Sequence, residues 1–511
     1  MIFADALRLC DDPLLAISVP LALSHVCARW RKISISKPSL WTRVVLLNPV
    51  LDSAQIERTV TWLTRSEPQP LEILLDFRVS DWWDHDEPEE NDHPFTVEML
   101  ESVLKILLRY VGQWKTFEML TDTWEPMHAF LCHINTVDEV GGAVKAPLLQ
   151  SLALSRCNEY LVTKGASFQP DDLKEPVALF GGDSAELERL RDVSLTGVHV
   201  DWTRSCLRNL HVLSLKFHSA DVMPSLPEFE SMLSACPKLE GLTVLGWGPV
   251  LHDGSDGSHK AKTGSNPQES MPVLHLPSLK RLSYGFVDAN YAIRFLRLLS
   301  MPSLHSFELQ DLAASVSQVN LDAPLDCTPL IEWLILNHQD HSWSSPGPCH
   351  HIPLGQIERL ELEGLRSSKE TFARFLRAFA LLKKICLYNA DRNVMSALHP
   401  GSSSRDESLP GPTAIEGRER RRQRSSASLM PLCPQLAHMV CRRVDYKSLL
   451  EMVSARCQEG SGVQPLQTLE IDSSGDDLED EGSSHALTNE DHETLVKSGV
   501  DLVVYGREAR I

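Results

Sequence analysis

A short pattern of apolar residues, L-x-x-L-x-L with other apolar side chains allowed, recurs eleven times along the chain. The last two apolar residues of each pattern alternate with polar ones, so they point to one side of a short strand. The apolar positions are Leu149/Leu152/Leu154, Leu190/Val193/Leu195, Leu210/Leu213/Leu215, Leu239/Leu242/Val244, Leu279/Leu282/Tyr284, Leu304/Phe307/Leu309, Ile331/Leu334/Leu336, Ile357/Leu360/Leu362, Leu382/Ile385/Leu387, Leu436/Met439/Cys441 and Leu466/Leu469/Ile471. One such pattern is weak evidence, but eleven indicate a repeated structural unit.

The pattern is evenly spaced in the middle of the chain. From Leu279 to Leu382, successive patterns begin 25, 27, 26 and 25 residues apart, within the range of about 20–29 residues for leucine-rich repeats. The apolar stripe of Lys369–Leu382 predicts a helix that returns the chain to the next parallel strand. We therefore predict an α/β leucine-rich-repeat solenoid, with parallel strands on the concave side and helices outside.

Three segments interrupt the repeats. Residues 252–272 are rich in Gly, Ser and His, residues 400–428 are rich in Ser, Gly and Pro, and residues 473–485 are acidic. Such compositions do not supply a packed core, so we expect loop insertions. The chain then divides into a small helical segment at 1–48 and a solenoid at 49–511.

Helices and strands also alternate ahead of the first pattern. Residues 53–64 have a helical pattern behind the capping residues Asp52 and Ser53, and a second helix runs from Thr96 to about Val111. Leu71–Phe77 and Trp114–Leu120 are short apolar runs of strand length. Two helix–strand units are therefore predicted before the array begins.

Charge and composition exclude some classes of partner. The 511 residues include 49 Lys and Arg against 69 Asp and Glu, a net charge of −20, which argues against a general nucleic-acid binder. No apolar run approaches the roughly 20 residues of a membrane span, and no secretory signal is visible. The 12 scattered cysteines suit reduced thiols. We expect a cytoplasmic or nuclear protein, or both, with no nucleic-acid or membrane partner.

A second pattern lies near the N-terminus. Residues 21–44, LALSHVCARWRKISISKPSLWTRV, set apolar residues three or four apart, as on one helix face, and then begin a short helix with Pro38. The segment resembles the second half of an F-box, and more narrowly the F-box-like domain of mushroom-forming fungi. The residues that carry the resemblance are Leu23, Val26, Cys27, Trp30, Arg31, Pro38, Leu40 and Trp41.

The resemblance implies a substrate-recognition adaptor of an SCF-type cullin-RING ubiquitin ligase. In this family the F-box helices bind a Skp-type protein, which joins a cullin, and the repeats bind a protein substrate. Carried over by position, the residues for the Skp-type partner are Leu21, Leu23, Val26, Cys27, Trp30, Leu40 and Trp41. Some of them must also hold the helices together.

The start of the chain departs from the family pattern. The family opens with an L-P-x-E-type helix before a D-D-P turn, whereas Met1 here comes only a few residues before Asp11-Asp12-Pro13. We therefore expect an incomplete first helix. Either the gene model begins too late, or the protein has lost its Skp-type partner.

Residues that alternate with the buried leucines are expected to face the concave side of the array. Both signs of charge and two aromatic rings among them suit a protein-binding face. Ordinary outward alternation of polar residues explains most of them equally well. The candidates for substrate binding are Arg281, Glu308, Trp333, Arg359, Glu361, Lys384 and Tyr388.

Motifs of enzymes and metal sites are missing from the sequence, which has no H-E-x-x-H, G-x-S-x-G, P-loop or G-x-G-x-x-G. The acidic run Asp81–Asp92 lacks the spacing of a calcium loop, and Cys349-His350-His351 lacks a second pair of zinc ligands. We predict no catalytic residues, no cofactor and no metal. The run Arg418–Arg424 suits a nuclear localisation signal or an acidic partner.

Two other functions remain open. One is a protein-binding scaffold in which a decayed F-box only caps the repeats, since solenoids need terminal caps. The other is an enzyme whose site has no sequence signature; a well-formed pocket with perturbed ionisable groups would favour it.

Overall fold

The computed structural model describes most of the chain in two compact units, Met1–Thr263 and Gly264–Ile511, and each unit is considered by itself. The described residues are Phe3, Cys10, 12–47, 49–50, 52–79, 93–135, 144–156, 162–180, 187–251, 273–313, 325–339, 352–400, 432–458, 463–472, 493, 495–497 and 499–505. The boundary between the units falls within 252–272. Apart from Pro400, the three predicted insertions lie outside the described residues, as do Asp81–Asp92, Cys349–His351 and Arg418–Arg424.

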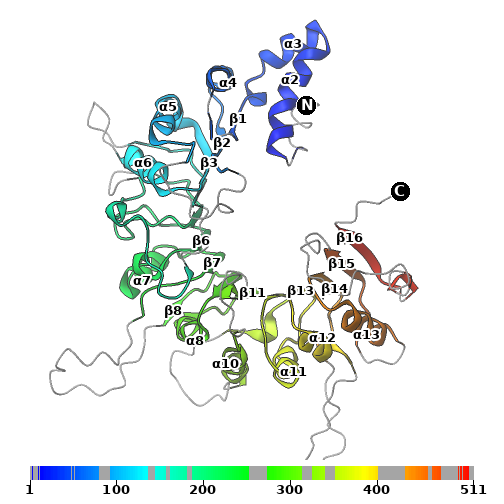
Figure 1. Cartoon of the computed structure of the whole chain (residues 1–511). Coiled ribbons are helices and arrows are strands. Elements are labelled where there is room, and N and C mark those ends of the chain that lie inside the picture. The colour runs from blue at the N-terminus through cyan, green and yellow to red at the C-terminus, as the bar shows by residue number, and fades with distance from the viewer. Residues whose placement is uncertain are drawn as a thin grey trace, which may run out of the picture. The chain divides into compact units, whose positions relative to one another are not determined.

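Parallel strands form the sheet of the first unit, each paired with the next strand in the chain. The strands are β1 (Arg43–Leu46), β2 (Leu71–Asp76), β3 (Trp114–Thr121), β4 (Ser151–Arg156), β5 (Asp192–Thr196), β6 (Val212–Lys216) and β7 (Gly241–Leu245). Helices cover one face of this sheet (Figure 1). They are α4 (Ser53–Ser66), α5 (Val97–Leu107), α6 (Trp124–Asn135) and α7 (Leu226–Ser234), with short 3₁₀ turns η4 (Leu108–Gln113), η6 (Asp171–Leu173) and η8 (Ala220–Val222).

The second unit repeats this arrangement, again with strands in chain order. Its strands are β9 (Arg281–Phe286), β11 (Ser306–Asp311), β12 (Arg359–Glu363), β13 (Lys384–Tyr388), β14 (His438–Arg442), β15 (Thr468–Asp472) and β16 (Asp501–Tyr505), beside a separate pair β8 (Leu274–His275) and β10 (Leu299–Ser300). Its helices are α8 (Ala289–Arg297), α10 (Thr328–Gln339), α11 (Lys369–Arg377), α12 (Arg392–Leu398) and α13 (Tyr446–Cys457), with the 3₁₀ turn η9 (Leu354–Gln356).

Aligned aliphatic side chains form the core of both units. In the second unit, for example, the register stacks Leu309 on Leu362 and Leu362 on Leu387, and all three are at most 1% exposed. Full burial of one such side chain is worth about 1.5–3 kcal/mol, so each strand depends on its neighbours for its apolar face. The predicted fold class, an α/β repeat array with parallel strands and helices on one face, is confirmed.

Ten of the eleven patterns coincide with a strand, but the pattern at Ile331 does not. It lies in helix α10, and β11 pairs directly with β12. The buried residues Leu330, Ile331, Leu334 and Ile335 have the spacing of a helix, whereas Leu336 is 55% exposed. The predicted strand here was therefore wrong, and the even spacing at this point arose from a helix whose apolar residues imitate the strand pattern.

The prediction for the N-terminal apolar stripe was also wrong in one respect, because two helices form where a single helix was expected. Helix α2 (Pro13–Val26) ends before Cys27, whose φ of −161° and ψ of 168° are those of extended backbone, and α3 (Ala28–Ile35) begins after it. The Cys27 sulfur accepts the N–H of Trp30 at 3.5 Å, so this residue caps the second helix. The short turn η1 (Pro38–Leu40) follows, as predicted.

Because α10 is a helix, replacing Leu334 and replacing Leu336 should lower the free energy of unfolding by different amounts. Leu334→Ala, at a position 1% exposed, should lower the free energy of unfolding by about 2–5 kcal/mol, because it leaves a cavity. Leu336→Ala, at a 55% exposed position, should cost under about 0.5 kcal/mol. Urea unfolding followed by circular dichroism measures both. Similar large losses from the two variants would restore the strand assignment, in which both side chains face the core.

Candidate protein-binding surfaces

A small cluster joins the N-terminal helices to the first unit. Leu40 and Trp41, at 1% and 0% exposed, pack with Trp62 of α4, and the rings of Trp41 and Trp62 meet edge to face at 4.6 Å between centroids. The Trp41 indole N–H donates to the carbonyl oxygen of Ser34 at 2.9 Å, and the Ser34 hydroxyl donates to that of Pro20 at 3.0 Å. Both helices are thereby fixed to the start of the sheet.

Beyond that cluster, α2 and α3 present large apolar side chains to solvent. They are Leu15 (58% exposed), Leu21 (40%), Val26 (61%), Trp30 (37%), Ile33 (40%) and Ile35 (42%), a set called the helical face below. Because burying apolar groups is favourable, their concentration on two short helices makes this surface a candidate for protein binding.

The residues assigned by position to the Skp-type partner thus fall into two groups. Leu21, Val26 and Trp30 belong to the helical face, and Cys27 is exposed beside them. Leu23 packs against the Trp41 cluster, while Leu40 and Trp41 are themselves inside it. In this structure the second group supports the helices and the first group is accessible.

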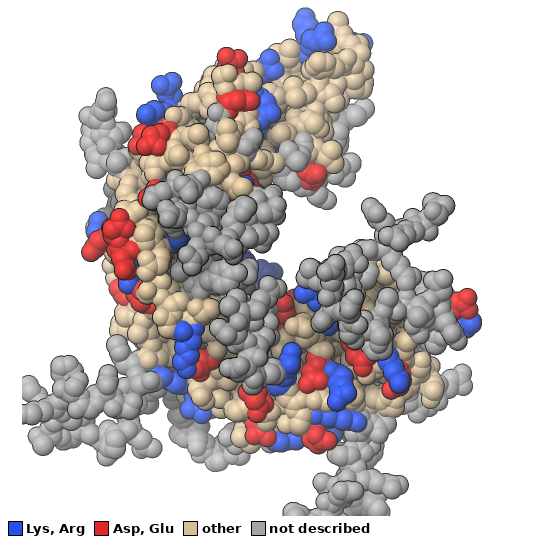
Figure 2. Space-filling model, in the orientation of Figure 1, with Lys and Arg blue, Asp and Glu red and all other residues tan. Residues whose placement is uncertain are grey.

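Positive charge accompanies the helical face. Residues 12–41 contain four Lys and Arg (Arg29, Arg31, Lys32 and Lys37) against one Asp, a net charge of +3 in a chain of net charge −20. In Figure 2, blue side chains are visible on the part of the molecule formed by α3. Two identical faces of this kind would repel each other, and an acidic partner would be attracted.

The predicted substrate-binding residues of the second unit lie mostly together. The strand register places Arg281, Arg359 and Lys384 in one row across β9, β12 and β13, and Glu308 beside Glu361 in the next row. These side chains alternate with the buried leucines and are half-buried or exposed. We call this surface the open face of the second unit.

Charges on the open face are largely paired within it. A guanidinium nitrogen of Arg359 lies 3.0 Å from the Glu361 carboxylate, and the Lys384 ammonium lies 3.8 Å from that of Glu470. Burial, reinforced by Glu308 and Glu361, raises the pKa of the Glu363 carboxyl. Exposed pairs of this kind add about 0–1 kcal/mol each to stability, so their larger effect is to set the charge pattern a partner meets.

Two aromatic candidates differ in position. Tyr388 ends β13 on the open face, paired in register with Glu363, and burial raises the pKa of its phenol. Trp333 was expected on a strand but lies in α10, where the Arg297 guanidinium stands 5.9 Å from its ring centroid. The assignment of Trp333 to the concave side was therefore wrong, for the same reason as the strand at Ile331.

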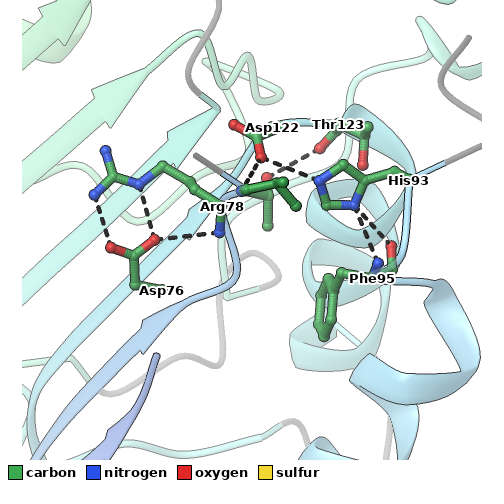
Figure 3. Close-up of polar contacts among 8 residues, drawn as sticks. Asp76, Arg78, His93, Phe95, Asp122 and Thr123 are labelled. Carbon is green, nitrogen blue, oxygen red and sulfur yellow. Dashed lines mark hydrogen bonds and ion pairs between the residues drawn. The ribbon is translucent and has the colours of Figure 1, made fainter. Parts of the chain in front are cut away.

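A buried ionisable pair lies at the carboxyl ends of β2 and β3 (Figure 3). The backbone N–H of Phe95 donates to His93 Nδ1 at 3.1 Å, so Nε2 carries the ring proton and points to Asp122 at 3.0 Å. Asp122 also accepts the backbone N–H of Val79 at 2.7 Å. Both side chains are at most 3% exposed. Because Asp122 contacts both Val79 and His93, it holds together the two segments that flank residues 80–92. The role of the pair is therefore structural.

Two further histidines are buried at the same edge of the sheet. Burial lowers the pKa of His199 to about 4 and that of His218 to about 4. Each Nε2–H donates to a backbone carbonyl oxygen at 2.8 Å, that of Lys174 for His199 and that of Val198 for His218. Both rings are therefore neutral at pH 7 and hold adjoining loops together.

Nothing in the sequence pattern signalled these loop residues, because their partners come from separate segments that only the fold brings together. Within the described ranges, no group of three or more His, Cys, Asp or Glu side chains is arranged to hold a metal ion. Of the helices described, none is both long and apolar enough to cross a bilayer. A scan against protein-family models finds no match to this chain, and a search of curated proteins finds no relative.

The buried histidines predict that mild acid destabilises the fold. The unfolded chain protonates each imidazole near pH 6.5, whereas the folded chain does so only near pH 4, so stability is lost as the pH falls between these values. Between pH 7 and pH 5 the loss is about 2 kcal/mol for each ring. Urea unfolding of the full chain at both pH values measures it.

His218→Gln keeps an N–H donor for Val198 and removes one titrating group, so it should shrink the difference between the two pH values by about 2 kcal/mol. His25→Gln, at an exposed position of α2, is the matched control and should leave the difference unchanged. An unchanged difference in His218→Gln would show that this imidazole is not the acid-sensitive group.

Proposed function

We propose that this protein is a substrate-recognition adaptor of an SCF-type cullin-RING ubiquitin ligase. The helices α2 and α3 bind a Skp-type protein, which joins the cullin, and the repeat units bind a protein substrate. The adaptor performs no chemistry; it brings substrate lysines close to a ubiquitin carrier and so raises their effective concentration.

The observation that carries the proposal is the helical face. It includes two residues of the F-box-like pattern: Val26, which is 61% exposed, and Trp30, which is 37% exposed and has its ring centroid 4.9 Å from that of Phe3. The other tryptophan of that pattern, Trp41, is buried in the core cluster. A helix pair that served only as a cap would gain nothing from so much uncovered apolar surface, which costs solubility.

Charge supports the choice of partner. The net charge of +3 on residues 12–41 favours binding to an acidic protein, and it disfavours pairing with a second copy of the same face. The cationic side chains flank apolar ones, so the expected interface has an apolar centre and a charged rim. Rim charges chiefly raise the association rate, and that contribution weakens at high salt.

The repeat units support the second half of the proposal. Their open face in the second unit carries rows of both charge signs beside Tyr388, an arrangement suited to a polar protein surface. Since the strands and helices already satisfy the core, these side chains are available without cost to the fold.

Binding to a purified Skp-type protein of a mushroom-forming fungus tests the proposal. The double variant Val26→Ser/Trp30→Ala should weaken binding by at least about 100-fold, because it removes two exposed apolar anchors. The control Val60→Ser/Leu336→Ser changes apolar residues of α4 and α10 that are 42% and 55% exposed, and it should bind normally.

Surface plasmon resonance gives the affinities, and circular dichroism shows whether each variant is folded. Leu23→Ala is a poor test by comparison, since this residue packs against the Trp41 cluster and its loss acts on folding. No binding by the unaltered chain, or equal binding by both double variants, would contradict the adaptor function. The scaffold in which the F-box is only a cap would then be the better account.

A further inference from the structure

The last strand described in the second unit, β16, has an open edge. It pairs with β15 on one side, and no strand that the structure describes pairs with its other side (Figure 1). The edge of a sheet presents a row of backbone N–H and C=O groups, so it is a template for a further strand. Proteins commonly protect such an edge with Lys or Pro, and β16, with the sequence DLVVY, contains neither.

Leu502 and Val504 direct their backbone groups to this edge. The N–H of Asp501 donates to the carbonyl oxygen of Gln467, just before β15, at 2.8 Å. Alternate residues of a strand in a parallel sheet bond to opposite neighbours. Asp501 and Val503 therefore face β15, while Leu502 and Val504 offer two donors and two acceptors to any strand that pairs at the edge.

The side chains of β16 are also incompletely covered. In register, Leu502 and Val504 lie beside Leu469 and Ile471 of β15, which are both 0% exposed, yet they are themselves only half-buried. On the opposite face Val503 is 37% exposed, and of the strands described β16 alone exposes large apolar side chains to this degree. A strand added at the edge would cover the half-buried pair, which is favourable.

The sequence of β16 is complementary to itself when two copies run antiparallel about Val503. Leu502 then lies opposite Val504 of the second copy, and both residues direct their N–H and C=O groups across the junction, as a hydrogen-bonded pair requires. Asp501, the one charged residue of the strand, lies opposite Tyr505 of the second copy. The two Asp501 carboxylates are then about 14 Å apart along the strand, farther than the Debye length of about 8 Å at physiological salt.

Charges next to the strand add little repulsion between two copies. The Lys497 ammonium lies 3.2 Å from the Glu493 carboxylate, so these two charges offset each other. With Asp501, the described residues between 493 and 505 hold one basic and two acidic side chains, a net charge of −1 in a chain of net charge −20. This end of the sheet is therefore nearly neutral, which permits contact between identical surfaces.

We propose that the edge of β16 pairs with the same edge of a second copy of this chain, antiparallel and centred on Val503. The same surface serves both copies, so a two-fold axis gives a closed dimer. Pairing continues the sheet of one second unit into that of the other and covers Leu502 and Val504 of both. One pair of short strands buries less area than a standard protein interface, so the dimer dissociates on dilution. The inference goes beyond the adaptor function and does not depend on a Skp-type partner.

Sedimentation of the full chain in the analytical ultracentrifuge tests for the dimer, which should form as the concentration rises through the micromolar range. Val504→Pro removes an N–H donor at the open edge and keeps the bonds to β15, so it should weaken dimerisation at least about tenfold. The control Val60→Ser changes a 42% exposed residue of α4 and should dimerise normally. Circular dichroism shows whether each variant is folded. A chain that stays monomeric, or a dimer that Val504→Pro leaves unchanged, would overturn the proposal.

Cross-linking tests the register of the pairing. The two Val503 residues lie opposite each other as a pair without mutual hydrogen bonds, with Cα atoms about 4.5 Å apart, which a disulfide can span. Val503→Cys should therefore form a covalent dimer with oxidised glutathione, whereas Tyr505→Cys should not, because its two copies are about 14 Å apart. Mass spectrometry of the digested dimer identifies the linked peptides, and the unaltered chain, whose Cys27 is exposed, gives the background. Equal cross-linking of the two variants, or none in Val503→Cys, would contradict the antiparallel pairing and with it the proposal.

Discussion

Each strand of this protein buries apolar side chains that it cannot cover alone, and the rest of the structure depends on that constraint. Two aliphatic positions on a five-residue strand such as β12 are covered only when strands on both sides are in register. The parallel order follows, because a helix or loop must carry the chain back before each new strand. A shift of register by one residue would turn these leucines to the opposite face.

The same constraint gives the N-terminal helices their place. The array begins at β1, whose buried Val44 and Leu46 have a neighbouring strand on one side among the strands that the structure describes. The cluster of Leu40, Trp41 and Trp62 lies beside this first strand and fixes α2 and α3 there. Capping the array and presenting the helical face are thus two results of one packing arrangement. The residues of the F-box-like pattern divide between those tasks.

The sequence was sufficient for the fold class because stacking repeats one pattern many times. It also predicted α4 behind its Asp52 cap, as well as β2 and β3. It failed where two periodicities coincide: the apolar residues of α10 fit both a helix and L-x-x-L-x-L, so Trp333 was assigned to the wrong surface. The sequence could not indicate that Cys27 interrupts the N-terminal helix, because this break depends on local capping.

Sites made by distant loops were beyond sequence reasoning altogether. His199 and Trp202 belong to the loop after β5 and Asp221 to the loop after β6, and no short motif joins the two loops. The exposure of Val26 and the burial of Trp41 likewise depend on which side of the helix pair packs against α4. Patterns along the chain identified residue types, while packing decided which of them are accessible.

Hydrogen–deuterium exchange of the full chain, alone and with a Skp-type protein, tests the central claim most directly. The claim is that the Skp-type protein binds α2 and α3 while the stacked strands serve as a stable frame. Added partner should slow amide exchange in Pro13–Ile35 and leave the strands of the second unit unchanged. Slower exchange in those strands with none in α2 and α3, or no change anywhere, would contradict the account.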